Sequence, residues 1–441
     1  MKQRHRSGKI IKAVLKACDP SLAVGRAVQT LQPCNGRTLL LAVGKAAVTM
    51  AAAALRVPGF SVDRGLAVTK YGHADPAVLA ALPEERRRLL RIREAGHPIA
   101  DSNSYAAAEE AIAMVQGLDK EDRVLLLLSG GGSALFEKPL LPPEEMADIN
   151  RQLLACGAKI SEINTIRKRL SRVKGGRFAA LCAPAQVVTV ALSDVLGDDP
   201  ASIASGPACP DPTTCADAIS IVERYGLRLG SQALSLLAAE TPKSLPNASV
   251  QVVGGMGIAR AAAARACTML GYRTKLFLPA LTGEAAAAGR FFGALAGKAR
   301  RENRSLAIVA GGETVVRLGK VHGLGGRNQE AALAAAPLLR GLDDCCFFSL
   351  GTDGTDGPTD AAGGYADGET AGRLAACGIS PAVALRRHDA YHALQSAKGL
   401  LFTGPTGTNV NDVCVVLVGS GSPRARSGQT GEKQRECKQK H

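Results

Sequence analysis

The amino-acid sequence predicts an α/β protein with two domains, each built around its own sheet. Short, continuous apolar runs alternate with helix-forming stretches along most of the 441 residues, which is typical of buried parallel strands with helices between them. The 49 glycines gather in short loops between these segments, as tight strand-to-helix turns require. The chain is also long enough to form more than one core. We therefore expect a larger, Rossmann-like, doubly wound domain followed by a smaller C-terminal α/β domain.

The larger domain is expected to span residues 1–302. Its strands are predicted where apolar residues run without interruption, at 38–44, 65–70, 123–128, 185–195 and 247–255. Its helices are predicted in stretches rich in helix-forming residues, at 45–55, 74–96, 104–118, 256–271 and 281–301. Because the strands are apolar throughout, we expect a mostly parallel sheet covered on both faces.

The smaller domain is expected to span residues 303–420. Strands that end in Gly/Asp loops are predicted at 305–319 and 345–357, with a helix between them at 328–342 and a last strand at 412–420. Residues 421–441 are polar and without pattern, so we expect a basic, disordered tail.

The net charge of +15 is concentrated at the two ends of the chain. Residues 1–16 carry six Lys and Arg and no acid, and residues 421–441 carry six Lys and Arg against two Glu. The modest positive bias of the remainder suits an anionic small substrate. Aromatic residues make up only 3% of the chain and no nucleic-acid-binding module is recognisable, so we expect no nucleic-acid partner. For residues 1–16, a surface helix is favoured over a transit peptide.

Cysteine usage and hydropathy indicate the compartment. The 12 cysteines form no CxxC motif and no regular framework, which favours a reducing cytoplasm over a secreted protein. No apolar run approaches the roughly 20 residues that a membrane span needs. We therefore expect a cytoplasmic protein without a membrane partner, either a monomer or a homodimer.

The loop "SGGGS" follows the most apolar strand and comprises Ser129, Gly130, Gly131, Gly132 and Ser133. Neither serine fits the G-x-S-x-G pattern of a hydrolase nucleophile, and the chain has no P-loop. Three glycines and two hydroxyls can line an anion pocket, because exposed backbone N–H groups bind phosphates and carboxylates. The alternative is a simple strand-to-helix turn.

A second glycine-rich loop, at 350–364, carries Asp353, Asp356 and Asp360. The spacing does not fit an EF-hand. Carboxylates this close repel one another unless a cation or hydrogen-bond donors intervene, so Mg²⁺ held near phosphate oxygens is one interpretation and Asx turns that cap a helix are the other. Asp194, which follows another strand, is a further candidate metal ligand.

Two basic residues stand at predicted helix starts. Arg327, followed by Asn328, can clamp a phosphoryl group or carboxylate with its planar fork, or can be an ordinary surface residue. Lys45 follows a strand in "VGKAA" and can contact an anion, or simply begin its helix. His97, in "GHPIADSNS", is expected to cap the next helix and is given no catalytic role.

Taken together, these stretches resemble the class II glycerate 2-kinases, whose C-terminal half is the MOFRL domain. The resemblance spans about residues 8–420. The motifs that carry it, in family order, are "VGKAA", "GHPIADSNS", "LLLLSGGGSAL", "INTIRKRLSRVKGGR", "LSDVLGDDPASIASGP", "AGGETVVRLG", "GLGGRNQEAAL", "GTDGTDGPTDAAGG" and "TGPTGTNVNDV".

The resemblance implies ATP-dependent phosphorylation of D-glycerate to 2-phosphoglycerate in three-carbon acid metabolism of the serine, glyoxylate or tartrate type. It also implies an active site between two α/β domains, with Lys45 and Arg327 in catalytic roles. We expect ATP to be bound by the SGGGS loop together with Asn328 and Asn409, and Mg²⁺ by Asp194, Asp353 and Asp356.

The sequence departs from the family at residues 252–260, "VVGGMGIAR", where an Asn-containing loop is common. The main alternative activity is an NAD(P)H-dependent hydroxypyruvate reductase. It is disfavoured because no G-x-G-x-x-G follows a strand with an acid about 20 residues further on. A non-catalytic nucleotide sensor is expected to lack Lys45 or Arg327, and both are present.

Overall fold

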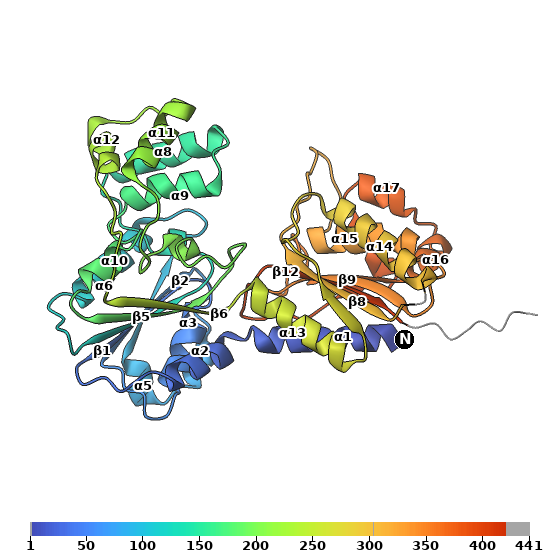
Figure 1. The fold of residues 1–441 in the computed structure, drawn as a ribbon, viewed down its shortest axis with the longest axis horizontal. Helices are drawn as coiled ribbons and strands as arrows, with labels where there is room; N and C mark the ends of the chain where they lie inside the picture. The colour runs from blue at the N-terminus through green and yellow to red at the C-terminus, as the bar shows by residue number, and fades with distance from the viewer. Residues whose placement is uncertain (1, 303, 420–441) are drawn as a thin grey trace, which may run out of the picture.

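The computed structural model describes residues 2–302 and 304–419 and shows two lobes placed end to end (Figure 1). The predicted disorder of residues 421–441 lies outside the described residues. Each lobe is built on one six-stranded sheet, so the predicted two-domain α/β class is confirmed. None of the described helices has the length and apolar character to cross a membrane.

The sheet of the first lobe is entirely parallel, with the order β3-β2-β1-β4-β5-β6. Its strands are β1 (Thr38–Val43), β2 (Arg64–Lys70), β3 (Leu90–Ala95), β4 (Arg123–Leu128), β5 (Gln186–Leu192) and β6 (Ala248–Gly254). The central strands β1 and β4 are buried at every position, which explains their uninterrupted apolar sequences. The strand order reverses between β1 and β4, and ligands of open α/β sheets bind at such a point, beyond the carboxyl ends of the strands.

Helices cover both faces of this sheet, as predicted. One face packs on α6 (Ser102–Met114), α7 (Gly132–Leu135) and α10 (Arg177–Leu181). The other packs on α2 (Pro20–Gln29) and α3 (Ala47–Leu55). The short helices α4 (Pro76–Ala80) and α5 (Glu84–Arg88) lead into β3. The prediction of a single helix over 74–96 is therefore wrong at the C-terminal end of that range. Leu90–Ala95 is an edge strand, and its exposed charged side chains conceal the strand pattern.

A helical insertion, not anticipated from the sequence, stands above the first sheet at the upper left of Figure 1. It comprises α8 (Pro143–Ala155), α9 (Ile160–Arg169), α11 (Cys215–Tyr225) and α12 (Ser231–Ala238), which share their own apolar core; the 3₁₀ turn η1 (Ile203–Ser205) precedes α11. Buried ion pairs fix α9 in place: Asp211 lies 3.2 Å from Lys168 Nζ and 3.4 Å from Arg169 Nη1.

The sheet of the second lobe has the order β11-β10-β9-β12-β8-β7, and only β7 and β8 run parallel. Its strands are β7 (Arg273–Leu276), β8 (Leu306–Gly312), β9 (Cys345–Gly351), β10 (Gly363–Asp367), β11 (Leu400–Leu401) and β12 (Asp412–Val418). One face packs on α14 (Ala285–Arg301), α15 (Arg327–Leu339), α16 (Thr370–Ala376), α17 (Pro381–Arg386) and α18 (Ala390–Ser396).

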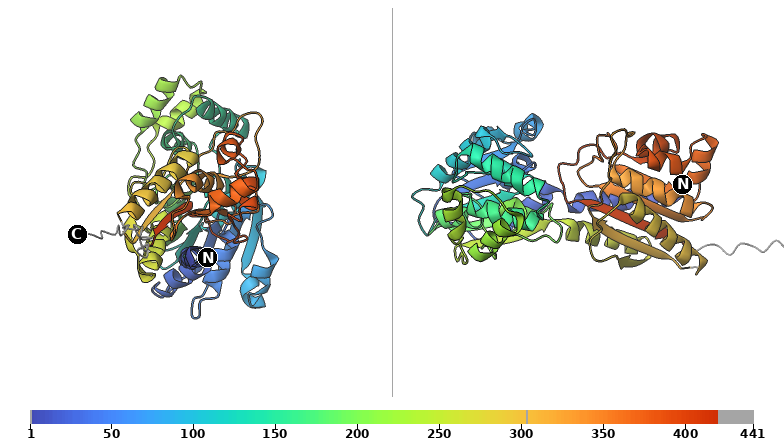
Figure 2. Two further views of the ribbon diagram at one scale, coloured as in Figure 1. Left: turned by 90° about the vertical axis from the view of Figure 1, so that its right-hand side faces the viewer. Right: turned by 90° about the horizontal axis from the view of Figure 1, so that it is seen from above.

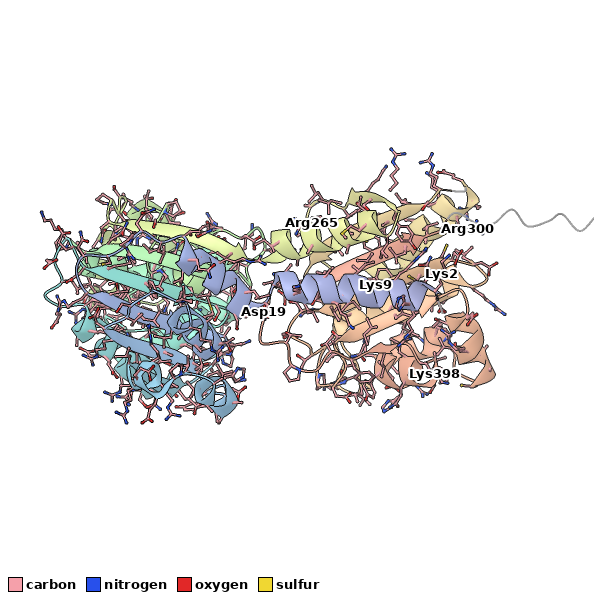
Figure 3. All side chains as sticks on the ribbon, turned by 90° about the horizontal axis from the view of Figure 1, so that it is seen from below. Lys2, Lys9, Asp19, Arg265, Arg300 and Lys398 are labelled. Atoms are coloured by element: carbon pink, nitrogen blue, oxygen red, sulfur yellow. The ribbon has the colours of Figure 1, made fainter. Side chains whose placement is uncertain are left out.

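The other face of the second sheet packs on α1 (Lys2–Ala17) and α13 (Met256–Met269), which lie side by side along the underside of this lobe (Figure 3). Residues 2–16 thus form a surface helix that buries Ile10, Ile11 and Val14. Its four lysines are exposed, whereas Arg4 donates to the Leu400 carbonyl and Arg6 to the Tyr272 hydroxyl of the second lobe.

The pairing of the strands places the boundary between the two domains elsewhere than the predicted position at 302/303. Helices α1, α13 and α14 and strand β7 all belong to the second lobe, so the first lobe spans about residues 20–254. Apolar periodicity alone does not tell which of two sheets a helix covers, and the expected division failed for that reason. The chain crosses between the lobes twice, after α1 and after β6, as Figure 2 shows from above.

Candidate active site

The loops after β1 and β4 interlock at the point where the strand order reverses. Gly44 has a φ of +125°, and a Cβ there would lie 2.2 Å from Ser129 Oγ, so only glycine fits. The Ser129 hydroxyl accepts a hydrogen bond from the Ala46 N–H at 3.1 Å, and the Lys45 N–H donates to the Gly130 carbonyl at 2.9 Å. Ser129 is therefore a buried residue that positions Lys45, and its hydroxyl is already engaged within the protein.

The glycines of the SGGGS loop bring three polar side chains together. A Cβ on Gly131 would lie 3.0 Å from His97 Cδ2 and 3.5 Å from Lys45 Cγ. A Cβ on Gly130 would lie 2.4 Å from Asp194 Oδ2. Larger residues would fill the space around which Lys45, His97 and Asp194 gather. Among the described residues, Lys45 forms no ion pair, so its charge is free to meet an anion.

The two titratable neighbours of Lys45 have shifted pKa values. Burial raises the pKa of Asp194, and Glu313 of the second lobe raises it further, against the lowering influence of Lys45. Burial also lowers the pKa of His97, and the positive charge of Lys45 adds to this. His97 is therefore neutral at pH 7. The two lobes face each other here, because Leu196 of the first lobe lines the same pocket as Glu313 of the second.

Ser133 leads into a chain of hydroxyl and amide groups. Its Oγ lies 3.0 Å from Ser205 Oγ, which donates to Asn164 Oδ1 at 3.3 Å. Ala204 and Ser205 adopt left-handed backbone conformations, with φ of 50° and 60°. Such strain in non-glycine residues concentrates at functional sites. Sequence reasoning did not select Ser205 or Asn164, although both stand in motifs that carried the family resemblance.

In the second lobe, Arg327 begins α15 and forms a bidentate ion pair with Asp412 at the start of β12. Its Nε and Nη2 lie 2.6 Å and 3.1 Å from the two carboxylate oxygens, and its Nη1 lies 3.0 Å from Glu313 Oε1. The side chain keeps 34% of its surface exposed. The guanidinium is thus held rigidly while one side remains open to a ligand. Asp412 and Glu313 were not selected from the sequence, because neither lies in an acidic cluster.

Asp356 caps the start of α15 from within the protein. Its Oδ1 accepts from the Asn328 N–H and Nδ2, each at 3.1 Å, and its Oδ2 accepts from the Gln329 N–H at 2.8 Å. Burial raises its pKa to about 6, although these donors oppose the shift. The Asn328 side chain is equally buried and also accepts from Ser349. These contacts favour the helix-capping interpretation of Asp356 and place Asn328 inside the protein.

The other candidates lie in local turns. Asp353 Oδ1 accepts from the N–H of Thr355 at 2.9 Å and from its hydroxyl at 3.1 Å, which is an Asx turn. Asn409 Oδ1 accepts from the Asn411 N–H at 3.3 Å. Within residues 2–302 and 304–419, no group of three or more His, Cys, Asp and Glu is placed to hold a metal ion. A metal held by these residues would therefore depend on a ligand for most of its oxygens.

A pocket of about 440 Å³ lies beside Arg327, between the lobes. Leu196 contributes from the first lobe, and the rest of the lining comes from the second. That lining consists of Glu313, Thr314, Val315, Val316, Leu318, His322, Gly323, Gly325, Gly326, Arg327, Glu330, Gly357, Pro358 and His388. The lining combines apolar residues, among them Val315, Val316 and Leu318, with the polar side chains of Glu313, Arg327, Glu330 and His388.

Two family profiles match the chain. One, described as a domain of unknown function (DUF4147), matches residues 7–238, and the other, described as the MOFRL family, matches residues 306–412. The first covers more than half of the chain. The interval between them contains α13, β7 and α14, which the structure assigns to the second lobe.

Individual relatives match over nearly the whole length. The D-glycerate 2-kinase of Thermotoga maritima is 44% identical, over 93% of this chain and 97% of its own. A putative hydroxypyruvate reductase of Agrobacterium vitis is 41% identical, over 93% of both chains. The crystal structure of the Thermotoga maritima glycerate kinase superposes with a TM-score of 0.88, covering 95% of this chain and 99% of the other, at 42% sequence identity.

Proposed function

This chain belongs to the family of glycerate kinases with a MOFRL domain, and from that premise we propose that it transfers the γ-phosphoryl group of ATP to D-glycerate, forming 2-phosphoglycerate. One observation carries the proposal. Lys45, on the first lobe, has no ionic partner among the described residues, and Arg327, held by Asp412 and Glu313, lines the pocket to which Leu196 of the first lobe also contributes. Both substrates are anions, and two cations on opposite lobes can hold them together.

Phosphoryl transfer needs positioning and charge neutralisation more than a covalent nucleophile. The 2-hydroxyl oxygen of glycerate attacks the γ-phosphorus, the bond to the β,γ-bridging oxygen breaks, and ADP departs. Lys45 and Arg327 neutralise charge on the transferring group. We assign the hydroxyl proton to His97, whose neutral imidazole stands beside Lys45 and the SGGGS loop. The hydrogen-bonded side chains of Ser133, Ser205 and Asn164 offer further hydrogen bonds to glycerate.

Mg²⁺ fits this donor set in part. It is usually bound by one or two carboxylates together with substrate phosphates, and each lobe offers one: Asp194 beside the SGGGS loop and Glu313 in the pocket beside Arg327. They would hold Mg²⁺, which supplies charge neutralisation for the phosphates. Asp353 remains a second candidate, whereas the Asp356 oxygens already accept hydrogen bonds from α15.

The hydroxypyruvate reductase alternative draws on the names of some relatives and on the strand order of the first sheet, which dinucleotide-binding domains share. The loop after β1 argues against it. This is where a dinucleotide fold carries its G-x-G-x-x-G, and here the chain has Lys45 in "VGKAA".

We also propose a cytoplasmic location, because all eleven described cysteines are unpaired. The preference for monomer or homodimer stays a prediction.

One assay tests the activity. The protein is incubated with ATP, MgCl₂ and D-glycerate, and the product is resolved by ³¹P NMR. We expect 2-phosphoglycerate. Formation of 3-phosphoglycerate would contradict the regiochemistry, and NADH oxidation by hydroxypyruvate without ATP-dependent phosphorylation would establish the alternative.

A further inference from the structure

The pocket beside Arg327 has more apolar wall than a three-carbon acid can use. Leu196, Val315 and Leu318 line it, yet each keeps more than a third of its surface exposed. Exposed apolar side chains gathered around a concavity usually mark a binding site. At about 440 Å³, the pocket is also within the usual size range for a cofactor or drug-sized ligand.

Part of the polar lining of the pocket is preorganised. His388 Nδ1 lies 3.0 Å from Glu330 Oε2, and Glu330 is buried. His388 adopts a left-handed conformation with a φ of 50°, which is uncommon outside glycine, although histidine adopts it more readily than most residues.

Backbone contacts on both sides of His388 hold this conformation. The Gly323 N–H donates to the Arg387 carbonyl at 2.7 Å, and the Tyr391 N–H donates to the Leu324 carbonyl at 3.0 Å. These bonds fix the loop over 313–326 to the segment that carries His388. The two segments that supply most of the apolar lining and His388 are therefore held together.

The charges around the pocket discriminate between possible ligands. Glu313 and Glu330 would repel a carboxylate placed deep in the pocket, whereas a carboxylate accepts hydrogen bonds from ribose hydroxyls or from a base amino group. Arg327 stands at the edge of the same pocket, where it can meet phosphate oxygens. Glycerate has no apolar surface to match Val315 and Leu318, and a nucleobase does.

We propose that this pocket binds the nucleoside of the phosphoryl donor. The base lies against Val315 and Leu318, the ribose or the base amino group faces Glu330, and the phosphates extend past Arg327 toward Lys45. Glycerate then occupies the opposite side, on the SGGGS loop of the first lobe. This assignment rests on the proposed kinase function, and it divides the two substrates between the two lobes.

Two substitutions in one loop test the assignment. Leu318 lines the pocket and is 56% exposed, whereas Val321 lies three residues further on, is 94% exposed and does not line it. L318E and V321E therefore add the same charge to the same loop, inside and outside the pocket. Both side chains are exposed, so neither change disrupts a core.

Binding of ATP and of inorganic tripolyphosphate to the full-length protein is measured by calorimetry with MgCl₂ and without glycerate. The ratio of the two affinities reports the contribution of the nucleoside, because the charge effect of a new glutamate on phosphates acts on both ligands. We expect L318E to reduce the preference for ATP at least tenfold, E330Q to reduce it about threefold, and V321E to leave it within twofold. Thermal melting confirms that each variant is folded.

An unchanged preference in L318E and E330Q would overturn the assignment, as would a loss of glycerate affinity in place of ATP affinity. The proposed function fails separately. A wild-type protein that prefers ATP through this pocket but phosphorylates no glycerate would refute the activity and leave the pocket assignment intact. Conversely, if the wild type phosphorylates glycerate but L318E and E330Q keep the wild-type preference for ATP, the pocket assignment is refuted and the proposed activity stands.

Discussion

Replacing Asp356 with alanine separates the two interpretations of the aspartate loop. In the structure its carboxylate accepts three hydrogen bonds from two residues at the start of α15, the Asn328 N–H and Nδ2 and the Gln329 N–H. Each buried donor left without a partner costs about 1–3 kcal/mol, and loss of a helix N-cap costs about 1 kcal/mol. These effects overlap, because the donors are neighbours. We therefore expect D356A to destabilise the second lobe by roughly 3–5 kcal/mol.

Differential scanning calorimetry measures this loss. At about 2–4 °C per kcal/mol, the second-lobe transition should fall by roughly 10 °C. D353A is the matched control, because Asp353 accepts only from Thr355 in a local turn, and its transition should move by a few degrees at most. A D356A protein with unchanged melting and a weakened Mg²⁺ response in the ATP assay would refute the capping interpretation and restore Asp356 as a metal ligand.

The pKa of Asp356 adds a dependence on pH to this prediction. Its folded value of about 6 lies above its ordinary value of 3.8. The protonated form is therefore favoured by folding, so the associated stability is complete below about pH 3.8 and is lost as the pH rises through about 6. The decline in melting temperature of the second lobe between these pH values should be shallower in D356A than in the wild type, and an identical slope would contradict the assigned shift.

Three further predictions concern the reacting groups. K45A should lower kcat by at least a hundredfold with melting within a few degrees, and near-normal turnover would exclude a catalytic Lys45. R327A should lower kcat/KM and should reduce the compaction expected in small-angle scattering when an ATP analogue and glycerate bind. R327K keeps the charge but loses the bidentate fork, so it should recover part of both effects. Identical scattering profiles for all proteins, with and without ligands, would contradict closure of the lobes. If His97 accepts the hydroxyl proton, kcat/KM of the wild type should decline at acid pH as His97 becomes protonated; H97N should lose this decline, and a retained decline would assign it to another group.

The first sheet could be predicted because its central strands, β1 and β4, are buried on both faces. A continuous apolar run such as Arg123–Leu128, with a helix on either side, fits a buried parallel strand, and the structure places strands at all five predicted positions of that lobe. The strand at Leu90–Ala95 was hidden because an edge strand exposes charged side chains. β7, at the edge of the second sheet, was hidden in the same way by its largely exposed residues.

The positions of the site residues could be predicted only as strand ends. Lys45 and the SGGGS loop lie together because β1 and β4 are neighbours, and parallel strands end at the same edge of a sheet. The partners of Arg327 could not be predicted, because Asp412 follows 85 residues later and reaches it only through the antiparallel pairing of β12 with β8. The density of aspartates at 353–360 suggested a cation, yet the donors that satisfy Asp356 belong to a distant helix start that the loop sequence does not reveal.

Residues 252–260, where the sequence departs from the family, form the second crossing between the lobes, from β6 to α13. A Cβ on Gly255 would lie 2.4 Å from Asp198 Oδ1, and Asp198 Oδ2 accepts from the Gly257 N–H at 3.2 Å. Asp198 belongs to the first lobe and Gly257 to α13 of the second, so the carboxylate meets the first turn of the helix at which the chain changes lobes. The other crossing, at Cys18, is close enough for Asp198 to raise the pKa of its buried thiol, after the larger effect of burial. Asp198 thus ties the first lobe to the second crossing. Lys45 and Arg327 stand on opposite lobes, so a motion that brings them onto one phosphoryl group would have to be accommodated at the two crossings, and the contact of Asp198 with α13 would restrict it.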